Sequence, residues 1–355
     1  SSSVFDGWTF PGQRRFDLCR KHRGQCETPD LHSDCRSAMG QGEMRGFNYL
    51  PAWELNRSPR IVVAFEMDFL RNLDVFAKAI PRGERLTVVL QLGWSAEEPE
   101  VAAELRSRLA RAQELFPEAR FLVLANAPAE VKILDDFTEV YLAQHNAFLD
   151  PARYPVADAR SRKKFDAIYI ARLTPFKRHE LAVKIERLHL IGDYSSRESD
   201  YARRVLATLP RAVWSRKVPS FRIGRAICRA GCGLALSAAE GAMFSCGEYT
   251  LCGVPVVNTP NRGGRDTLLP ECAVRPAAPD PESVAEAVDF WRENPVDPRE
   301  IRQEFLKLAR PQKEFVQELL NSIAGKNVYL PHKLNIRCRL LPHQKWLHGI
   351  RLKES

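Results

Sequence analysis

The sequence lacks any long apolar run: no stretch approaches the ~18 consecutive apolar residues that a membrane-spanning helix needs. Its first residues, SSSVFDGWTFPGQRRF, lack the charged start and apolar core of a secretory signal peptide. No helix-turn-helix, zinc-finger or RNP pattern accompanies its basic residues. These absences argue against an integral membrane protein and against binding of nucleic acid, and they predict a cytoplasmic location.

The composition is that of a globular protein with room for two domains, because 45% of the 355 residues are hydrophobic and 27% are charged. The nine cysteines are an odd number, and several stand among apolar or small residues, so we expect reduced thiols. The net charge of +9 favours anionic ligands, such as nucleotides or acidic lipids.

Residues 1–60 are predicted to be irregular and without a strand, because glycine and proline recur throughout them. This region also holds enough thiol and imidazole groups for a tetrahedral zinc ion, at Cys19, His22, Cys26, His32 and Cys35. Their spacing matches no standard zinc finger. Ordinary reduced cysteines are therefore the main interpretation, and structural zinc is the alternative.

From residue 61 to 150, short β-branched segments alternate with helical patterns. Strands are predicted at 61–65, 86–92, 121–125 and 140–144, and helices at 68–79, at 97–115 and after Pro128. Such alternation predicts an α/β domain with a parallel, doubly wound sheet. A basic, polar linker at 151–164 would follow it.

A second α/β domain is expected over 165–310. It opens with a strand whose end carries the basic residues Arg172 and Lys177. A preorganised pair of cations at a strand end suits a ligand that develops negative charge, whereas the alternative is a solvated basic turn. Helices are predicted near 282–293, 298–309 and 312–322, so that 311–355 would hold C-terminal helices and a basic tail.

The most informative block is GCGLALSAAEGAMFSCGEYTLCGVPVVNTPNRGGRD, residues 231–266. It predicts a strand at 234–236, a loop with Glu240, a helix with Glu248, a strand at 254–257 and a turn at Gly263 and Gly264. In such a unit, ligands bind outside the carboxyl ends of the strands, where helix N-termini attract phosphate. The alternative is a buried helix with an incidental glutamate.

Glu240 and Glu248, with seven residues between them, resemble the Glu-x7-Glu signature of retaining, nucleotide-sugar-dependent glycosyltransferases with the GT-B architecture. Arg172 and Lys177 fall in register with that family's G-R-L-x-x-x-K-G pattern, in which Ala171 and Arg178 replace the flanking glycines. Further resemblances are IGD at 191–193, the segment from Val213 to Pro219 that would bracket the nucleotide base, and a loose match at 145–155.

The resemblance implies two Rossmann-like domains facing a cleft, the first apparently shortened or rebuilt. It implies that Arg172 and Lys177 bind the donor diphosphate, that Glu240 binds hydroxyls of the donor sugar, and that Glu248 binds the ribose. Met243, Phe244 and Val218 would complete the donor site. A carboxylate suits both glutamate roles because it can accept from two vicinal hydroxyls.

The acceptor side departs from the family, since Gly93 and Trp94 stand where a histidine is often found. His145 is a candidate catalytic substitute, and a structural hinge histidine is the alternative. No Asp-x-Asp sequence is present, so no metal site and no divalent cofactor are expected.

The expected function is hexosyl transfer from a nucleoside diphosphate sugar to a glycan or glycolipid, as in polysaccharide biosynthesis. A sugar-nucleotide epimerase or hydrolase, or a non-catalytic sugar-nucleotide-binding subunit, are the alternatives.

The tail, residues 331–355, carries six lysines and arginines against one acid, Glu354, with apolar residues between them. This mixture suits peripheral contact with an anionic membrane that holds a lipid-linked acceptor. The alternative is that the tail packs on the first domain.

Overall fold

The computed structural model describes residues 52–80, 83–328 and 330. The chain divides into two compact units: the first comprises residues up to Ala143 together with those from Glu314 onward, and the second runs from Gln144 to Lys313. The predicted linker, 151–164, is thus part of the second unit. Within the described ranges, no helix is long and apolar enough to cross a membrane.

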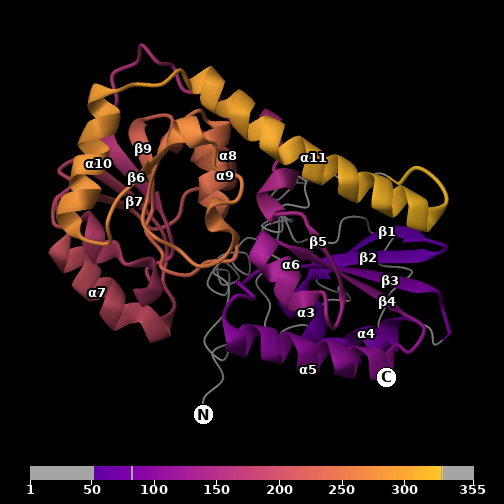
Figure 1. Ribbon diagram of the computed structural model, residues 1–355. Coiled ribbons are helices and arrows are strands. Elements are labelled where there is room, and N and C mark those ends of the chain that lie inside the picture. Colours follow the sequence, from indigo (N-terminus) through magenta and orange to yellow (C-terminus); the bar gives the residue numbers. More distant parts are fainter. Residues whose placement is uncertain (1–51, 81–82, 329, 331–355) are drawn as a thin grey trace, which may run out of the picture. The chain divides into compact units, whose positions relative to one another are not determined.

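The first unit contains a five-stranded sheet in the order β1-β2-β3-β4-β5 (Figure 1). Its parallel strands are β2 (Arg60–Phe65), β3 (Leu86–Gln91), β4 (Arg120–Ala125) and β5 (Glu139–Leu142). Every residue of β2 and β3 is buried, as expected for strands covered on both faces. The four strands predicted for this region are confirmed.

The prediction that residues 1–60 hold no strand is wrong. Strand β1 (Trp53–Arg57) pairs antiparallel with β2 at the edge of the sheet. Pro51 and Pro59 flank this strand rather than interrupt it, which is where proline is tolerated. The candidate zinc ligands at 19–35 and the basic tail at 331–355 lie outside the described residues.

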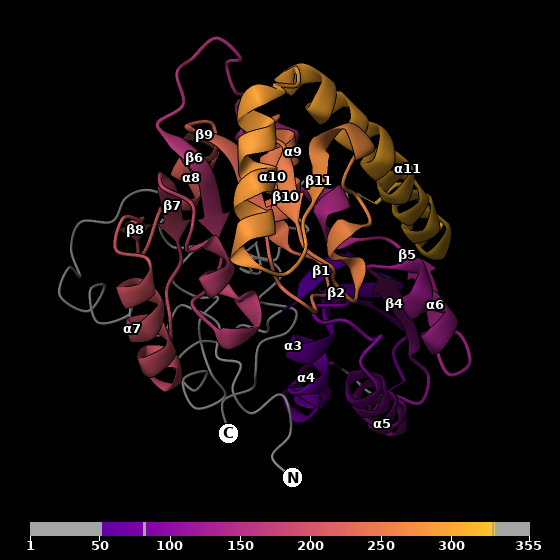
Figure 2. The same cartoon turned by 60° about the vertical axis from the view of Figure 1, so that its left-hand side comes forward.

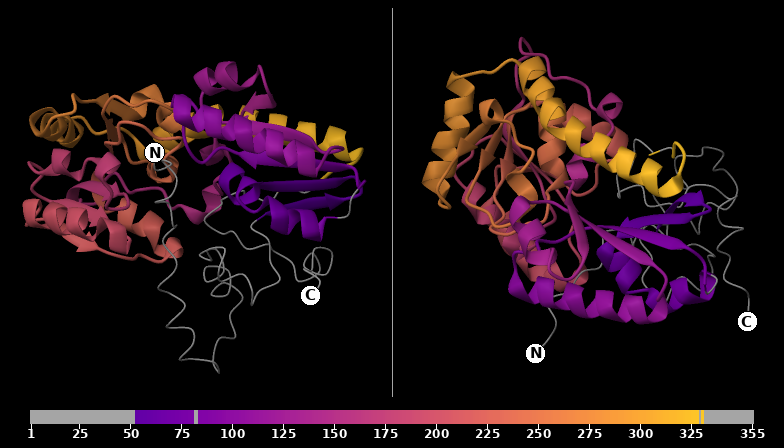
Figure 3. Two further views of the ribbon diagram at one scale, coloured as in Figure 1. Left: turned by 90° about the horizontal axis from the view of Figure 1, so that it is seen from below. Right: turned by 45° about the vertical axis from the view of Figure 1, so that its right-hand side comes forward.

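Helix α5 (Pro99–Leu115) runs along the first unit's sheet (Figure 3) and buries Val101, Leu105, Leu109 and Ala112. α6 (Pro128–Leu134) begins at its proline, as predicted. The helix predicted at 68–79 is instead two helices, α3 (Glu66–Leu70) and α4 (Leu73–Ala79). The break has a local cause: the side-chain amide of Asn72 donates to the Asp68 carbonyl oxygen at 2.7 Å, the acceptor that its own N–H would take in a continuous helix.

The second unit contains six parallel strands in the order β11-β10-β9-β6-β7-β8. They are β6 (Phe165–Ile170), β7 (Leu188–Ile191), β8 (Val213–Ser215), β9 (Ala230–Ala235), β10 (Val256–Asn258) and β11 (Val274–Pro276). β6, β9 and β10 lie close to the predicted strands, and β7 ends at the IGD motif, whereas no strand was predicted at β8 or β11. The parallel pairing brings all their carboxyl ends to one edge.

Helices cover both faces of this second sheet. Figure 1 shows β6, β7 and β9 between α10 (Pro281–Glu293) on one side and α8 (Ser220–Ile227) and α9 (Phe244–Leu251) on the other. Figure 2 shows α7 (Ser199–Thr208), which the sequence analysis missed, below β7 and β8. This arrangement is the predicted doubly wound sheet.

The two helices predicted at 298–309 and 312–322 are one helix, α11 (Pro298–Ala324), with Pro311 inside it. An internal proline removes a backbone hydrogen bond and costs about 3 kcal/mol. Buried apolar residues nevertheless follow one helical stripe on both sides of it: Ile301, Phe305, Ala309, Val316, Leu320 and Ala324. Burial of this stripe offsets the proline because each large side chain contributes about 1.5–3 kcal/mol.

Candidate functional site

The candidate site lies at the carboxyl edge of the second unit's sheet. The loops that follow β6, β7, β9 and β10 carry Arg172, Lys177, Glu198, Glu240 and Arg265. Because the strands are parallel, residues up to 93 positions apart in the sequence come to the same edge.

Lys177 and Glu240 form an ion pair at this edge, between the Lys177 Nζ and Glu240 Oε2 atoms. The two side chains are only 9% and 12% exposed, so water screens the pair weakly. The Tyr169 hydroxyl donates to the Lys177 carbonyl oxygen at 2.5 Å and holds the turn that carries the lysine. The sequence analysis placed both residues in the site but did not predict that they contact each other.

Arg172 is the second cation, and its Nη2 atom lies 3.0 Å from Glu198 Oε1. Burial lowers the pKa of its guanidinium, and Glu198 and Glu240 act in the opposite direction. Arginine remains charged in either case. Glu198 also accepts from the backbone N–H and the hydroxyl of Ser195, both at 2.8 Å, so the position of the carboxylate that faces Arg172 is fixed.

Arg178 stands where the resemblance expects a glycine, and its backbone is left-handed, with φ of 49° and ψ of 50°. A side chain in this region strains the backbone by about 1–2 kcal/mol. The guanidinium offsets that strain by donating to the Leu236 carbonyl oxygen at 2.5 Å and to Thr259 Oγ1 at 2.7 Å. Arg178 therefore ties the turn after β6 to the ends of β9 and β10.

Glu248 lies in α9 and is buried, with 3% of its surface exposed. The Tyr154 hydroxyl donates to Glu248 Oε1 at 3.2 Å. Arg302 in turn donates to the carbonyl oxygens of Tyr154 and Leu251, each at 2.7 Å. The glutamate is thus held on a rigid helix, and Tyr154 is a contact that the sequence did not indicate.

His145 begins a short 3-10 helix, η3 (His145–Phe148), and its side chain lies against the start of α9. Its ring stacks on that of Phe244, with centroids 4.0 Å apart and an interplanar angle of 17°. The neighbouring Asn146 amide donates to the Met243 carbonyl oxygen at 3.0 Å. The structure therefore brings His145, Met243 and Phe244 together, and all three belong to the second unit.

Val218 lies in the loop between β8 and α8, close in sequence to a cluster of aromatic and basic side chains. Tyr194 stacks near Trp214 with ring centroids 6.2 Å apart, and the Arg216 guanidinium lies 4.9 Å from the Tyr194 ring. Burial acts to raise the pKa of Asp193, but hydrogen bonds from Arg216 and the Tyr194 N–H, together with the charges of Arg216 and Lys217, lower that pKa overall. The loop is therefore built around a fixed carboxylate.

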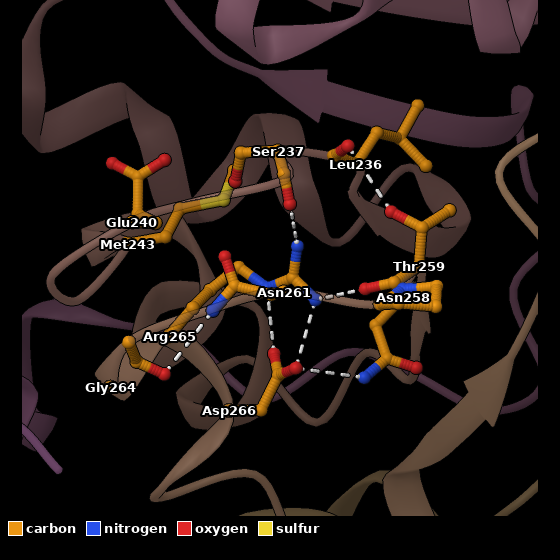
Figure 4. Close-up of polar contacts among 12 residues, drawn as sticks. Leu236, Ser237, Glu240, Met243, Asn258, Thr259, Asn261, Gly264, Arg265 and Asp266 are labelled. Carbon is orange, nitrogen blue, oxygen red and sulfur yellow. Dashed lines mark hydrogen bonds and ion pairs between the residues drawn. The ribbon is translucent and has the colours of Figure 1, made fainter. Parts of the chain in front are cut away.

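Arg265 is the main residue that the sequence analysis missed (Figure 4). It is fully buried and donates to the carbonyl oxygens of Ser237 at 2.6 Å and Thr259 at 2.5 Å. Burial acts to lower its pKa, but its ion pair with Asp266 raises it, so the charge persists. Arg265 fixes the loops after β9 and β10, while the Glu240 carboxylate points away from it in Figure 4. The sequence feature that could have indicated Arg265 is the Arg-Asp pair directly after Gly263 and Gly264.

Among residues 52–80, 83–328 and 330, no group of three or more His, Cys, Asp and Glu side chains is arranged to hold a metal ion.

At the carboxyl edge of the first unit's sheet, two buried carboxyl groups bind the loops. Glu66 accepts from the Gly93 N–H at 2.8 Å, and Glu130 accepts from the N–H groups of Ala96, Asn126 and Ala127 at 3.0, 2.6 and 3.1 Å. Burial raises the pKa of Glu66 to about 8 and that of Glu130 to about 7.

These pKa values predict a stability that falls as pH rises. A carboxyl group whose pKa is higher in the folded than in the unfolded chain favours folding at low pH, and this contribution is lost between about pH 4.5 and 8. Urea unfolding at a series of pH values should show this decline, and Glu66→Gln should flatten it. The control is Glu118→Gln, since Glu118 is exposed. An unchanged slope in Glu66→Gln would contradict the prediction.

The fold was compared with known proteins. No protein-family model matches the sequence, and no curated protein is detectably similar to it in sequence. Solved structures do match: HepE from Anabaena in complex with UDP (17% identity, 74% of this chain and 78% of HepE, TM-score 0.54) and sucrose-phosphate synthase from Thermosynechococcus elongatus (16%, 75% and 74%, 0.53). α,α-Trehalose 6-phosphate synthase from Burkholderia multivorans is similar as well (13%, 73% and 75%, 0.51).

These neighbours are GT-B glycosyltransferases. The chain therefore has the GT-B fold, which confirms the predicted fold class, with parallel sheets consistent with Rossmann-like domains.

Proposed function

We propose that this chain is a glycosyltransferase that moves a hexose from a nucleoside diphosphate sugar to a glycan or lipid-linked acceptor, with retention of the anomeric configuration. The observation that carries the proposal is the cluster at the carboxyl edge of the second sheet, where the buried Lys177 pairs with Glu240 and the partly buried Arg172 pairs with Glu198. The similar structure of HepE was solved with UDP and with UDP-glucose, so these are the first probes.

In this proposal, Arg172 and Lys177 stabilise the negative charge that grows on the diphosphate as the bond to the sugar breaks. Fixed charges in a site with little water act strongly because they need no reorganisation during the reaction. The Arg172 guanidinium and the Lys177 ammonium would together do the work that a divalent ion does elsewhere. Activity is accordingly expected to be unchanged by EDTA, and activity restored only by added magnesium would contradict this part of the proposal.

Glu240 and Glu248 are assigned different halves of the donor: Glu240 the sugar hydroxyls and Glu248 the ribose. Met243 and Phe244 at the start of α9, together with Val218, would line the remaining donor surface. His145, stacked on Phe244, is the proposed group on the acceptor side.

The division of roles predicts a difference between two variants. Glu248→Ala should weaken both UDP and UDP-glucose by about 10- to 100-fold, because hydrogen bonds to a carboxylate are worth about 1.5–3 kcal/mol. Glu240→Ala should weaken mainly UDP-glucose. Isothermal titration calorimetry measures both affinities, and equal losses for both ligands in both variants would contradict the assignment.

Tyr154→Phe is the matched control, because it removes only the hydroxyl that donates to Glu248. If Glu248 binds the ribose directly, this variant should lose much less affinity than Glu248→Ala. Product analysis then distinguishes the alternatives: a glycoside indicates transfer, a free or epimerised sugar indicates a hydrolase or epimerase, and binding without turnover indicates a non-catalytic subunit.

A further inference from the structure

Two cysteines meet at the C-terminal ends of α8 and α9. Cys228 is the residue directly after α8, and Cys252 is the residue directly after α9. Both residues donate a hydrogen bond to the carbonyl oxygen of Gly224. The Cys228 N–H donates at 3.0 Å, and the Cys252 thiol donates at 3.7 Å. The two cysteines therefore meet at one backbone group, with the Cys252 thiol and the Cys228 backbone on the same carbonyl oxygen.

The segment 155–163 packs over the same corner. The Cys228 thiol donates to the Pro155 carbonyl oxygen at 3.4 Å, and the Lys163 ammonium donates to the Cys228 carbonyl oxygen at 3.2 Å. A Cβ atom on Gly224 would lie only 2.6 Å from Pro155 Cδ, so the corner has no spare room.

The two thiols differ in a way that suits sequential reaction. Cys228 is partly exposed, whereas Cys252 is buried. The neighbouring Cys252 thiol and the charge of Lys163 lower the pKa of the Cys228 thiol, although burial acts in the opposite direction. Burial instead raises the pKa of Cys232 and Cys246. Cys228 therefore has the reachable, thiolate-favouring setting of a reactive cysteine.

We propose that Cys228 and Cys252 are a reversible oxidation site: a peroxide converts them to a disulfide, and the disulfide weakens nucleotide binding by the second unit. The oxidation itself is independent of the proposed function, whereas its effect on nucleotide binding rests on it.

The chemistry balances with one peroxide for each disulfide. The Cys228 thiolate attacks a peroxide oxygen, the O–O bond breaks, and Cys228 becomes a sulfenic acid with release of hydroxide. The Cys252 sulfur then attacks the Cys228 sulfur, the S–O bond breaks, and the departing hydroxide takes the Cys252 proton to form water. In sum, two thiols and one hydrogen peroxide give one disulfide and two waters.

The effect on binding follows from where the helices lead. A disulfide holds its two sulfur atoms about 2.05 Å apart, so it would fix the ends of α8 and α9 to each other. Glu248 is one turn before Cys252, and its carbonyl oxygen accepts from the Cys252 N–H at 3.1 Å. At the other end, α8 follows directly on the loop of Val218. Oxidation would therefore constrain elements that carry two parts of the proposed donor site.

The test oxidises the full chain with hydrogen peroxide, blocks the remaining thiols with an alkylating agent and maps the peptides by mass spectrometry. A Cys228–Cys252 cross-link, two hydrogens lighter, is expected in the wild type. It should be absent from Cys228→Ser and from Cys252→Ala, and present in Cys272→Ser, whose thiol is similarly exposed. A sulfinic acid on Cys228 without the cross-link, or a cross-link between other cysteines, would overturn the proposed site.

Calorimetry with UDP before oxidation, after it, and after dithiothreitol completes the test. We expect at least a fivefold loss of affinity on oxidation, recovered with dithiothreitol, in the wild type and Cys272→Ser but not in Cys228→Ser. An intact cross-link with unchanged affinity would overturn the regulatory part. If the reduced protein bound no nucleoside diphosphate, the proposed function would fail while the cross-link still decided the oxidation site.

Discussion

Replacing Lys177 or Arg172 by alanine is expected to lower kcat/KM for sugar transfer by about 10²- to 10³-fold, which corresponds to about 3–4 kcal/mol of lost transition-state stabilisation. The expectation rests on burial: the two side chains are 9% and 16% exposed, so each cation acts on the diphosphate with little screening by water. Steady-state kinetics with a sugar nucleotide would measure the loss.

The matched control is Lys184→Ala. Lys184 belongs to the same unit and is also paired with a glutamate, Glu282, but its side chain is 51% exposed. Exposed ion pairs contribute little, so this variant should keep wild-type kinetics. A loss of less than threefold in both site variants, with the folded structure intact, would rule out their assigned role.

The second large effect concerns stability. Gly253 has φ of +70°, and a Cβ atom there would lie 2.2 Å from the Pro298 carbonyl oxygen. Gly253→Ala therefore combines a strained backbone with a collision against main-chain atoms, and we expect a loss of more than about 4 kcal/mol in the free energy of unfolding.

Gly325→Ala separates the two causes. Gly325 has φ of +65°, nearly the same backbone, but nothing lies within 4 Å of the added Cβ. This variant should lose only about 1–2 kcal/mol, the usual cost of a left-handed non-glycine residue. Chemical denaturation measures both variants. Similar losses in the two variants would mean that backbone strain alone accounts for the effect and that Pro298 moves away from the added Cβ atom at little cost.

The central strands could be predicted from sequence because segments such as IVVAF and LTVVLQ are short, β-branched and buried on both faces. The helix boundaries were predicted less well, because they depend on side-chain hydrogen bonds and tertiary packing that a local sequence pattern does not contain. Asn72 breaks a helix through one side-chain hydrogen bond, and Pro311 fails to break another because buried residues continue on both sides of it. β1 is polar and partly exposed, so only its pairing with β2 reveals it.

In the candidate site, too, local sequence features could be predicted whereas tertiary contacts could not. Spacing and register were enough to select Arg172, Lys177, Glu240 and Glu248 as individual residues. Their partners could not be predicted, because Lys177 meets Glu240 across 63 positions and Glu248 meets Tyr154 across 94. Such contacts depend on strand order. The role of Arg265 was hidden for a further reason: a buried arginine is rare, and it is tolerated here only because Asp266 and two carbonyl oxygens surround it.

The ion pair between Lys177 and Glu240 has a consequence for the order in which a donor is recognised. If the proposed roles hold, an incoming diphosphate would replace Glu240 as the counter-ion of Lys177, and the carboxylate would then be released to accept from sugar hydroxyls. The two halves of the donor thus become interdependent, since each assists the other by the same free energy. A free hexose would meet a glutamate that is already engaged. The site without ligand would therefore bind a free hexose weakly, and it would bind the hexose well only when the hexose is attached to the diphosphate.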